Sequence, residues 1–170
     1  MAGIVNMNMK IKIIGAIIPL CAVLFLSCEE KDCCFAPPAE YIVFGHFYGY
    51  CVGEGCIEIY RIDDQGLLED TLDLYPGSTG FYSGDFNVQL PGEKFNLVND
   101  LESHIPAELW NETSVVLGQP DAGDWGGIYF EIKKGSTHQF WLLDQMDSNM
   151  PAAYNEFVDK INEKIALIHQ

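Results

Sequence analysis

The sequence predicts an α+β fold in which an antiparallel β-sheet carries one or two helices on one face, with the C-terminal helix covering the sheet. Two observations lead to this prediction. From Tyr41 onward, short runs of aromatic and β-branched residues alternate with turn signals, which is typical of strands. The C-terminal segment instead repeats apolar side chains at helical spacing, and a helix with so broad an apolar stripe needs a sheet to cover.

Two hairpins are expected to form most of the sheet. In residues 56–63 (CIEIYRID) apolar and polar side chains alternate with period two, and the glycine-bearing loop 49–55 joins them to the preceding strand. A second hairpin turns at residues 133–136. Asp63-Asp64-Gln65-Gly66 is a turn signal, after which the chain can return to the sheet. The expected strands are residues 41–50, 56–63, 67–74, 86–90, 128–132 and 139–143.

Two segments are expected to be helical. Apolar residues near helical spacing predict a helix over residues 93–105, which Pro106 ends. The C-terminal helix follows Pro151, which suits a first helical turn, and Glu156 can pair with Lys160 at i,i+4. Its broad apolar stripe predicts a core helix, and its polar face carries too little positive charge for a membrane-surface anchor. The stripe consists of Tyr154, Phe157, Val158, Ile161, Ile165 and Ile168.

The N-terminal residues have the composition of an export signal. Lys10 and Lys12 precede an almost unbroken apolar run, residues 13–26, which is short for a membrane-spanning helix. The segment that follows Cys28 is acidic and contains prolines. The expected organisation is therefore a lipoprotein signal peptide at residues 1–27, an acidic tether at 28–40 and a single α+β domain at 41–170.

The end of the apolar run, Leu26-Ser27-Cys28, resembles the relaxed lipobox of Bacteroidota lipoproteins. The resemblance implies cleavage before Cys28 and attachment of fatty acyl chains such as palmitate to that cysteine. Two or three acyl chains anchor a protein stably, since each buried CH₂ contributes about 0.8 kcal/mol. The expected location is the cell envelope, in the outer membrane, with the domain on the periplasmic or the surface face. Ordinary secretion, with Cys28 left as a thiol, is the alternative.

Several segments of the domain carry a second resemblance: residues 44–49, Cys51, residues 56–60, 118–127 and 141–144. Together they resemble a family of small, uncharacterised Bacteroidota lipoproteins. This resemblance implies an envelope location and a single domain, and it implies no activity.

The charge of the chain argues against nucleic acid as a partner. The sequence has nine basic and 25 acidic residues, and removal of residues 1–27 leaves seven and 25, a net charge of −18. Nucleic-acid binding depends on a basic patch that neutralises phosphates, and Arg61 is the single arginine. Such acidity fits solubility first and a cationic partner second.

Cys51 and Cys56 bracket Val-Gly-Glu-Gly at the tip of the first expected hairpin. In an exported protein, two cysteines on facing strand ends predict a structural disulfide. The alternative is a thiol redox pair, but redox pairs usually have Cys-x-x-Cys spacing at the start of a helix. Cys33 and Cys34 lie in the tether, and the sequence leaves their role open.

The most distinctive loop is residues 120–127 (PDAGDWGG). Asp121 and Asp124 are weak candidates for metal ligands, because calcium takes about six or more oxygens and the loop lacks the ligand pattern of an EF-hand. The favoured interpretation is a glycine-shaped turn in which one of these carboxylates accepts backbone N–H bonds and Trp125 packs. His46, in the first strand, is expected to be a hydrogen-bonded core or edge histidine.

The leading functional hypothesis is a non-enzymatic binding or interaction module, anchored to the bilayer through acylated Cys28 and needing no cofactor. Its partner is a protein or ligand that the sequence does not identify. One alternative is a metal-dependent or hydrolytic enzyme centred on Asp121 and Asp124 with His46 or His138. The other is a thiol redox protein using Cys51 and Cys56. The sequence contains no Gly-x-Ser-x-Gly, His-Glu-x-x-His or phosphate-binding loop, so no catalytic residue is assigned.

Overall fold

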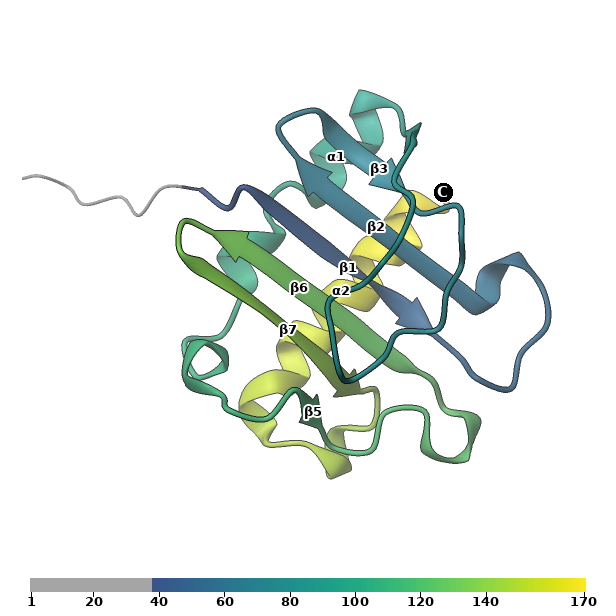
Figure 1. Cartoon of the computed structure of the whole chain (residues 1–170). Helices are drawn as coiled ribbons and strands as arrows, with labels where there is room; N and C mark the ends of the chain where they lie inside the picture. Colours follow the sequence, from purple (N-terminus) through teal and green to yellow (C-terminus); the bar gives the residue numbers. More distant parts are fainter. Residues whose placement is uncertain (1–37) are drawn as a thin grey trace, which may run out of the picture. The chain divides into compact units, whose positions relative to one another are not determined.

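Seven strands form one open sheet in the computed structural model of the chain, which describes residues 38–170 (Figure 1). The strand order is β4-β3-β2-β1-β6-β7-β5, and every pair is antiparallel except β5 with β7. The predicted signal peptide, most of the predicted tether, Cys28, Cys33 and Cys34 lie outside the described residues. The strands are β1 (Tyr41–Phe47), β2 (Ile57–Asp63), β3 (Gly66–Glu69), β4 (Val88–Gln89), β5 (Val116–Leu117), β6 (Gly127–Lys134) and β7 (Thr137–Asp144).

The two predicted hairpins form the centre of this sheet. β1 pairs with β2 from Tyr41↔Asp63 to Phe47↔Ile57, and β6 pairs with β7 along their whole length. β1 and β6 lie side by side, so the two hairpins join into a four-stranded core. The predicted antiparallel sheet is therefore confirmed, and β5, which runs parallel to β7, was not expected.

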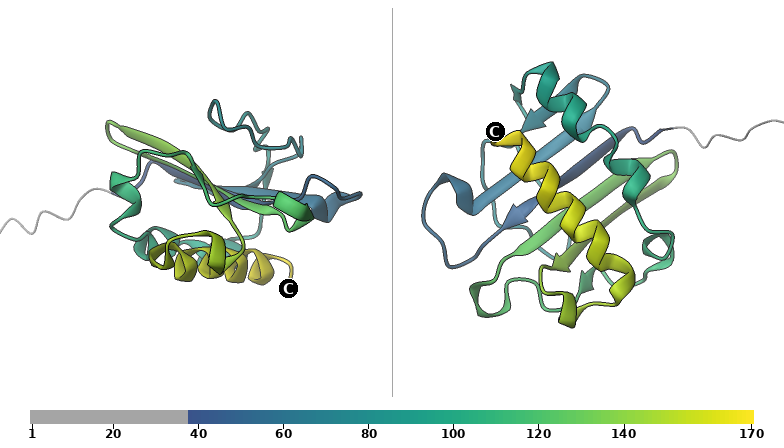
Figure 2. Two further views of the ribbon diagram at one scale, coloured as in Figure 1. Left: turned by 90° about the horizontal axis from the view of Figure 1, so that it is seen from below. Right: turned by 180° about the vertical axis from the view of Figure 1, so that it is seen from behind.

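The helices cover one face of the sheet, as predicted (Figure 2). The C-terminal helix α2 buries its apolar stripe on the central strands, and Phe157 meets Phe130 of β6 edge to face with ring centroids 4.8 Å apart. The helix expected over residues 93–105 is broken, because α1 ends at Val98 and a 3₁₀ turn follows. The helices are α1 (Gly92–Val98), α2 (Asn155–Ile168) and the 3₁₀ turns η1 (Glu54–Cys56), η2 (Leu101–His104), η3 (Leu109–Asn111), η4 (Ala122–Asp124), η5 (Asp147–Asn149) and η6 (Ala152–Tyr154).

The polar contacts of α2 differ from those expected. Lys160 pairs with Glu163 at i,i+3 and not with Glu156. Lys164, a charged residue outside the apolar stripe, is nevertheless only 6% exposed. Its ammonium donates to the Leu97 carbonyl at 2.8 Å and lies 2.6 Å from an Asp100 carboxylate oxygen. Lys164 therefore ties α2 to the end of α1 through two polar contacts, one with a backbone carbonyl and one with the exposed Asp100 carboxylate.

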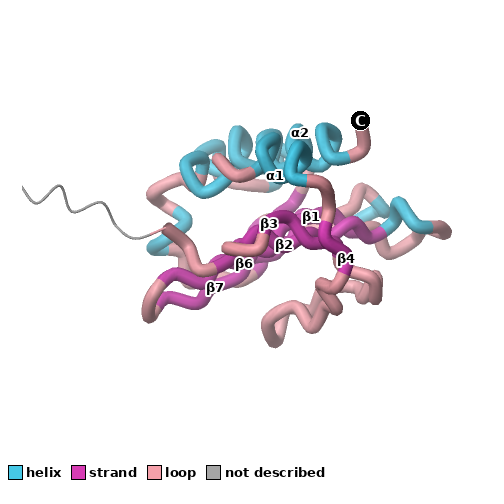
Figure 3. The backbone as a smooth tube through the Cα atoms, turned by 90° about the horizontal axis from the view of Figure 1, so that it is seen from above, coloured by secondary structure: helices cyan, strands magenta, loops and turns pink. Residues whose placement is uncertain are grey.

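An irregular segment, residues 70–87, covers the opposite face of the sheet; we call it the strap (Figure 3). The third strand was expected to reach residue 74, but β3 ends at Glu69 because Asp70 turns the chain away from the sheet. The buried Asp70 carboxylate accepts hydrogen bonds from the backbone N–H groups of Asp73 and Asp85 and from the Tyr82 hydroxyl. Tyr82 and Phe86 of the strap then pack on a second apolar cluster, formed by Val43, Phe47, Ile59, Tyr129 and Leu142.

The predicted tether ends on the folded domain. The backbone N–H of Ala39 donates to the Glu102 carboxylate at 2.9 Å, and that of Glu40 donates to the Lys133 carbonyl at 2.7 Å. These contacts seat the chain at the end of the sheet where β1 begins. Among residues 38–170, no helix is both long and apolar enough to cross a membrane.

Candidate functional site

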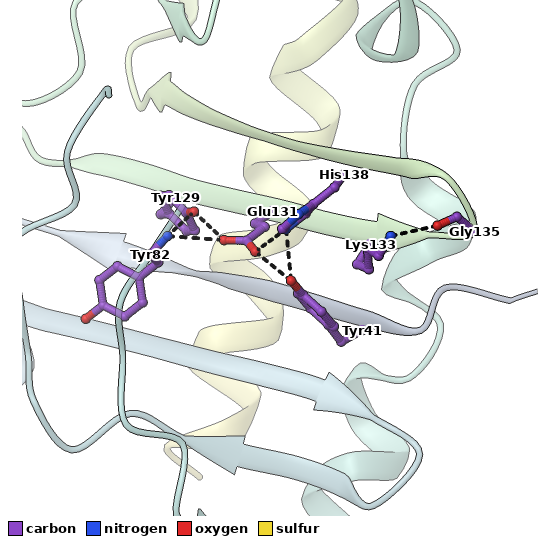
Figure 4. Close-up of polar contacts among 7 residues, drawn as sticks. All are labelled: Tyr41, Tyr82, Tyr129, Glu131, Lys133, Gly135 and His138. Atoms are coloured by element: carbon purple, nitrogen blue, oxygen red, sulfur yellow. Dashed lines mark hydrogen bonds and ion pairs between the residues drawn. The ribbon is translucent and has the colours of Figure 1, made fainter. Parts of the chain in front are cut away.

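A buried carboxylate, Glu131 of β6, lies on the strap-covered face at the centre of a polar cluster (Figure 4). Its two oxygens accept hydrogen bonds from the Tyr129 hydroxyl at 2.5 Å, the Tyr41 hydroxyl at 3.1 Å and the Tyr82 backbone N–H at 3.3 Å. The Nε2 atom of His138 lies 2.9 Å from Glu131 Oε1 and 2.9 Å from the Tyr41 hydroxyl. We call these residues the Glu131 cluster.

The register of the sheet assembles this cluster. Tyr41 of β1 and His138 of β7 both lie opposite Lys133 of β6. They are therefore diagonal neighbours of Glu131 on either side of it, within reach of long side chains. The Lys133 ammonium donates to the Gly135 carbonyl at 2.7 Å (Figure 4). The partners of Glu131 are instead two tyrosine hydroxyls, one backbone N–H and His138.

The cluster keeps its tyrosines protonated and its carboxylate enclosed. Burial, followed by the charge of Glu131 and the hydrogen bond to it, raises the pKa of Tyr41 to about 12. Burial and Glu131 also raise the pKa of Tyr129. Glu131 is only 3% exposed, and Phe81 of the strap stacks on the His138 ring at 3.5 Å between centroids. This geometry fits an anchor for the strap better than a site open to substrate.

Sequence reasoning missed Glu131, although a signal was present. Residues 128–132 (IYFEI) were expected to be a buried or alternating strand, and Glu131 is the charged residue within that apolar run. A carboxylate at such a position needs several donors, because burial of an unpaired charge is costly. The segment that supplies one of those donors, the strap, could not be placed from the sequence.

The Asp121 carboxylate joins three loops at the end of the sheet where β1 ends and β6 begins. It accepts the Gly49 N–H at 2.8 Å, the Tyr75 hydroxyl at 2.9 Å and the Gly126 N–H at 3.1 Å. A Cβ at Gly49 would lie 2.4 Å from the Asp121 oxygen, which explains the glycine there. As expected, Asp121 accepts backbone N–H bonds in a turn. Burial and the Asp121 contact raise the pKa of Tyr75 to about 12.

The enzyme alternative required these aspartates to meet a histidine. Within residues 38–170, no hydrogen bond joins His46 or His138 to Asp121 or Asp124. His46 faces the Gly55 carbonyl at 3.2 Å, as expected of an edge histidine, and burial lowers its pKa despite that contact. In the same range, no group of three or more metal-ligating side chains gathers around a point that could hold a metal ion.

The predicted disulfide between Cys51 and Cys56 is present, with the Cα atoms 5.6 Å apart. It closes the loop that follows β1. The Tyr48 N–H donates to the Cys56 carbonyl at 2.9 Å, so the base of the loop also carries a backbone hydrogen bond. The disulfide and Asp121 thus restrain neighbouring loops at the same end of the sheet.

The segments that Asp121 joins carry exposed aromatic and apolar side chains. Tyr50 follows Gly49 and is 86% exposed, whereas Trp125 precedes Gly126 and is 63% exposed. The expectation that Trp125 packs was therefore wrong. The residues on either side of it have positive φ angles, 64° at Asp124 and 74° at Gly126, and this turn leaves the Trp125 ring exposed to solvent. We call the set of exposed side chains on these joined loops the loop-end patch; it consists of Tyr50, Val52, Tyr75 and Trp125.

A groove of about 680 Å³ lies at the other end of the sheet, lined in part by Ala39, Tyr41, Arg61 and Phe95. It adjoins residues 38–40, which lead into β1. Comparison of the chain with protein-family models, with curated proteins and with solved structures finds no significant match to any of them.

Proposed function

We propose that the protein is a lipid-anchored interaction module of the bacterial envelope, and that it binds its partner through the loop-end patch. The observation that carries the proposal is the exposure of Tyr50, Tyr75 and Trp125 on loops that Asp121 and the Cys51–Cys56 disulfide hold in place. Tyr and Trp are enriched among the residues that dominate binding energy at interfaces.

Restraint of these loops matters for affinity. Ordering a mobile loop on binding costs free energy, so a loop already held in one conformation loses less. Asp121 joins the loop after β1, the strap and the loop before β6 through three hydrogen bonds. The loops that carry the patch are thus preorganised for binding.

The position of the patch suits a tethered domain. The proposed anchor, Cys28, precedes β1 by 13 residues, a segment that can span at most about 45 Å when fully extended. β1 begins at Tyr41 and runs for seven residues, about 20 Å, toward the loops that carry the patch (Figure 1). Anchoring at one end of β1 leaves the patch at the other end, free to meet a partner.

The lipid anchor is tested with Cys28→Ala, using Cys33→Ala as the matched control. We expect the Cys28 variant to leave the membrane fraction or to remain unprocessed, and to lose the mass of the acyl chains. The control should behave as the parent. Unchanged membrane fractionation and unchanged mass in the Cys28 variant would refute lipidation.

The interaction surface is tested by photo-crosslinking in the native cells. A photoreactive amino acid replaces Val52 in the patch or, as the control, the exposed Asp159 on α2. We expect a discrete crosslinked product from position 52 and none from position 159. Equal products at both positions, or no product at either, would contradict binding through the patch.

A further inference from the structure

We infer that the partner of the loop-end patch is a cationic polypeptide segment, rich in Lys or Arg. The inference rests on the proposed function and adds the chemistry of the partner. Three basic and three acidic residues precede residue 38, so the described residues hold six basic and 22 acidic residues. The six are Arg61, Lys94, Lys133, Lys134, Lys160 and Lys164.

None of these six cations belongs to the segments that meet at the loop end of the sheet. Residues 48–56, the strap, residues 118–126 and residues 145–149 contain no Lys or Arg. Gln145 donates to the Tyr48 hydroxyl at 3.2 Å, which places the last of these segments beside the first. Asp124 and Asp147, on two of the segments, are exposed. The field at this end of the molecule therefore has one sign and attracts positive charge.

The cations lie elsewhere and most have partners within the domain. Arg61 lies 3.0 Å from Asp63, and Lys133 opposes Tyr41, both at the far end of β1 from the patch. Lys134 pairs with Glu102, and Lys164 with Asp100. A cationic segment approaching the patch consequently meets no positive charge on the joined loops.

The aromatic rings of the patch suit the same partner. Lys and Arg bind over the faces of Trp and Tyr rings within about 6 Å of the ring centroid. The domain already contains this interaction, since the Arg61 guanidinium lies 4.5 Å from the centroid of the Tyr41 ring. Trp125 presents an exposed ring directly after the exposed Asp124, and Tyr50 presents a second exposed ring on a loop that Asp121 joins to the same turn. A second copy of the chain, an anionic lipid surface or a nucleic acid would be repelled by the same field.

The experiment measures binding of a peptide in which Lys and Arg alternate with Gly. It uses the purified full chain and follows Trp fluorescence and amide chemical shifts. Peptides of equal length with Glu, or with Ser, in place of the basic residues are the controls. We expect binding of the cationic peptide alone, weakened by salt, with shifts confined to the loop end. Replacing Tyr50 and Trp125 together by Ala should weaken it by at least about 10-fold.

Two charge variants of equal size separate a specific site from a general attraction. Asp124→Asn with Asp147→Asn removes two charges from the segments that meet at the loop end, whereas Glu156→Gln with Asp159→Asn removes two from the exposed face of α2. We expect the first pair to weaken binding several-fold more than the second. Equal losses, equal binding of the Ser peptide, or shifts that map to the helix face would overturn the inference.

The outcome is distinguishable from failure of the proposed function. If position 52 crosslinks to a neutral or acidic partner while the cationic peptide fails to bind, the patch is an interaction surface and the inference about charge is wrong. If neither crosslinking nor peptide binding occurs at the loop end, both proposals fail.

Discussion

Buried carboxylates hold the irregular segments of this fold in place. Asp70, Glu131 and Asp144 are each at most 5% exposed, and each gathers donors from separate parts of the chain. Asp144, at the end of β7, accepts the Gln119 N–H at 2.8 Å, the Met146 N–H at 2.8 Å and the Asn149 amide at 2.9 Å. Polar side chains thus order loops that lack a regular backbone ladder.

The pKa of Asp144 makes this contribution dependent on pH. Burial opposes its ionisation, but the hydrogen bonds from Met146, Asn149 and Gln119 outweigh burial and lower the pKa. The folded-state pKa of Asp144 lies below the unfolded value of about 3.9, so the ionised carboxylate stabilises the fold above that pH. This stabilisation is lost as the pH falls through the folded-state pKa. Asp144→Asn should therefore be less stable than the parent at neutral pH, with the difference shrinking below about pH 4.

Urea unfolding at a series of pH values measures that difference. The exposed Asp159→Asn serves as the control and should track the parent throughout. A stability difference between parent and Asp144→Asn that stays constant from neutral to acid pH would show that the carboxylate charge is not the stabilising feature.

The Cys51–Cys56 disulfide closes a short loop, and such a closure stabilises a fold by about 2 kcal/mol through the unfolded chain. Replacing both cysteines by Ser should lower the free energy of unfolding by about that amount. Chemical denaturation with and without reductant checks this, since reductant should affect the parent and not the double variant. A double variant as stable as the parent, together with thiol-exchange activity in the parent, would favour the redox alternative.

Two different elements cover the two faces of the sheet. α2 is a regular helix whose Phe157, Ile161 and Ile165 are buried on one face. The strap has no regular structure, yet Tyr82 and Phe86 bury apolar area on the other. The sheet is therefore the middle of three layers, and each outer layer needs its own polar contacts, Lys164 for the helix and Asp70 for the strap.

The helix is tested by truncation of its buried side chains. Phe157→Ala or Ile161→Ala should each cost about 2–5 kcal/mol of unfolding free energy, because each leaves a cavity in the core. Lys164→Met should cost about 1–3 kcal/mol, since it leaves the Leu97 carbonyl without its donor. Lys160→Met, the matched control, should change little, because Lys160 pairs with the exposed Glu163 and such surface pairs contribute at most about 1 kcal/mol. Equilibrium denaturation decides, and a Phe157→Ala variant as stable as the parent would contradict a core role for α2.

At the scale of the whole molecule, charge is strongly unbalanced. The chain has a net charge of −16 and a pI near 4.3. Like charges at this density repel one another in the compact state and lower its stability. The same imbalance is the basis of our proposal that the partner is cationic.

Salt should therefore stabilise the fold at neutral pH. Raising the NaCl concentration shortens the range of the repulsion, so the melting temperature should rise. Near the pI the same addition should have little effect, because the net charge is close to zero. Thermal unfolding followed by circular dichroism measures both cases, and KCl should act as NaCl does. A melting temperature that falls with salt at neutral pH would show that attractive ion pairs, such as Lys134–Glu102, outweigh the repulsion.

The sequence by itself determined the fold class, the two central hairpins, the C-terminal helix and the Cys51–Cys56 disulfide. These features depend on side-chain period and short-range spacing, which are visible along the chain. It predicted the N-terminal signal peptide and Cys28 lipidation as well, and these remain predictions because they lie outside the described residues.

Only the tertiary structure decided the strap on the second face, the parallel β5, the Glu131 cluster and the joining of three loops at Asp121. Each of these depends on residues that are distant in sequence, since Tyr41 and Glu131 are 90 positions apart and Gly49 and Asp121 are 72 apart. Periodicity reports which face of an element is buried, but it does not report what covers that face. Contacts of this kind form only when the sheet register brings the strands together, so they belong to the folded chain and not to any local segment.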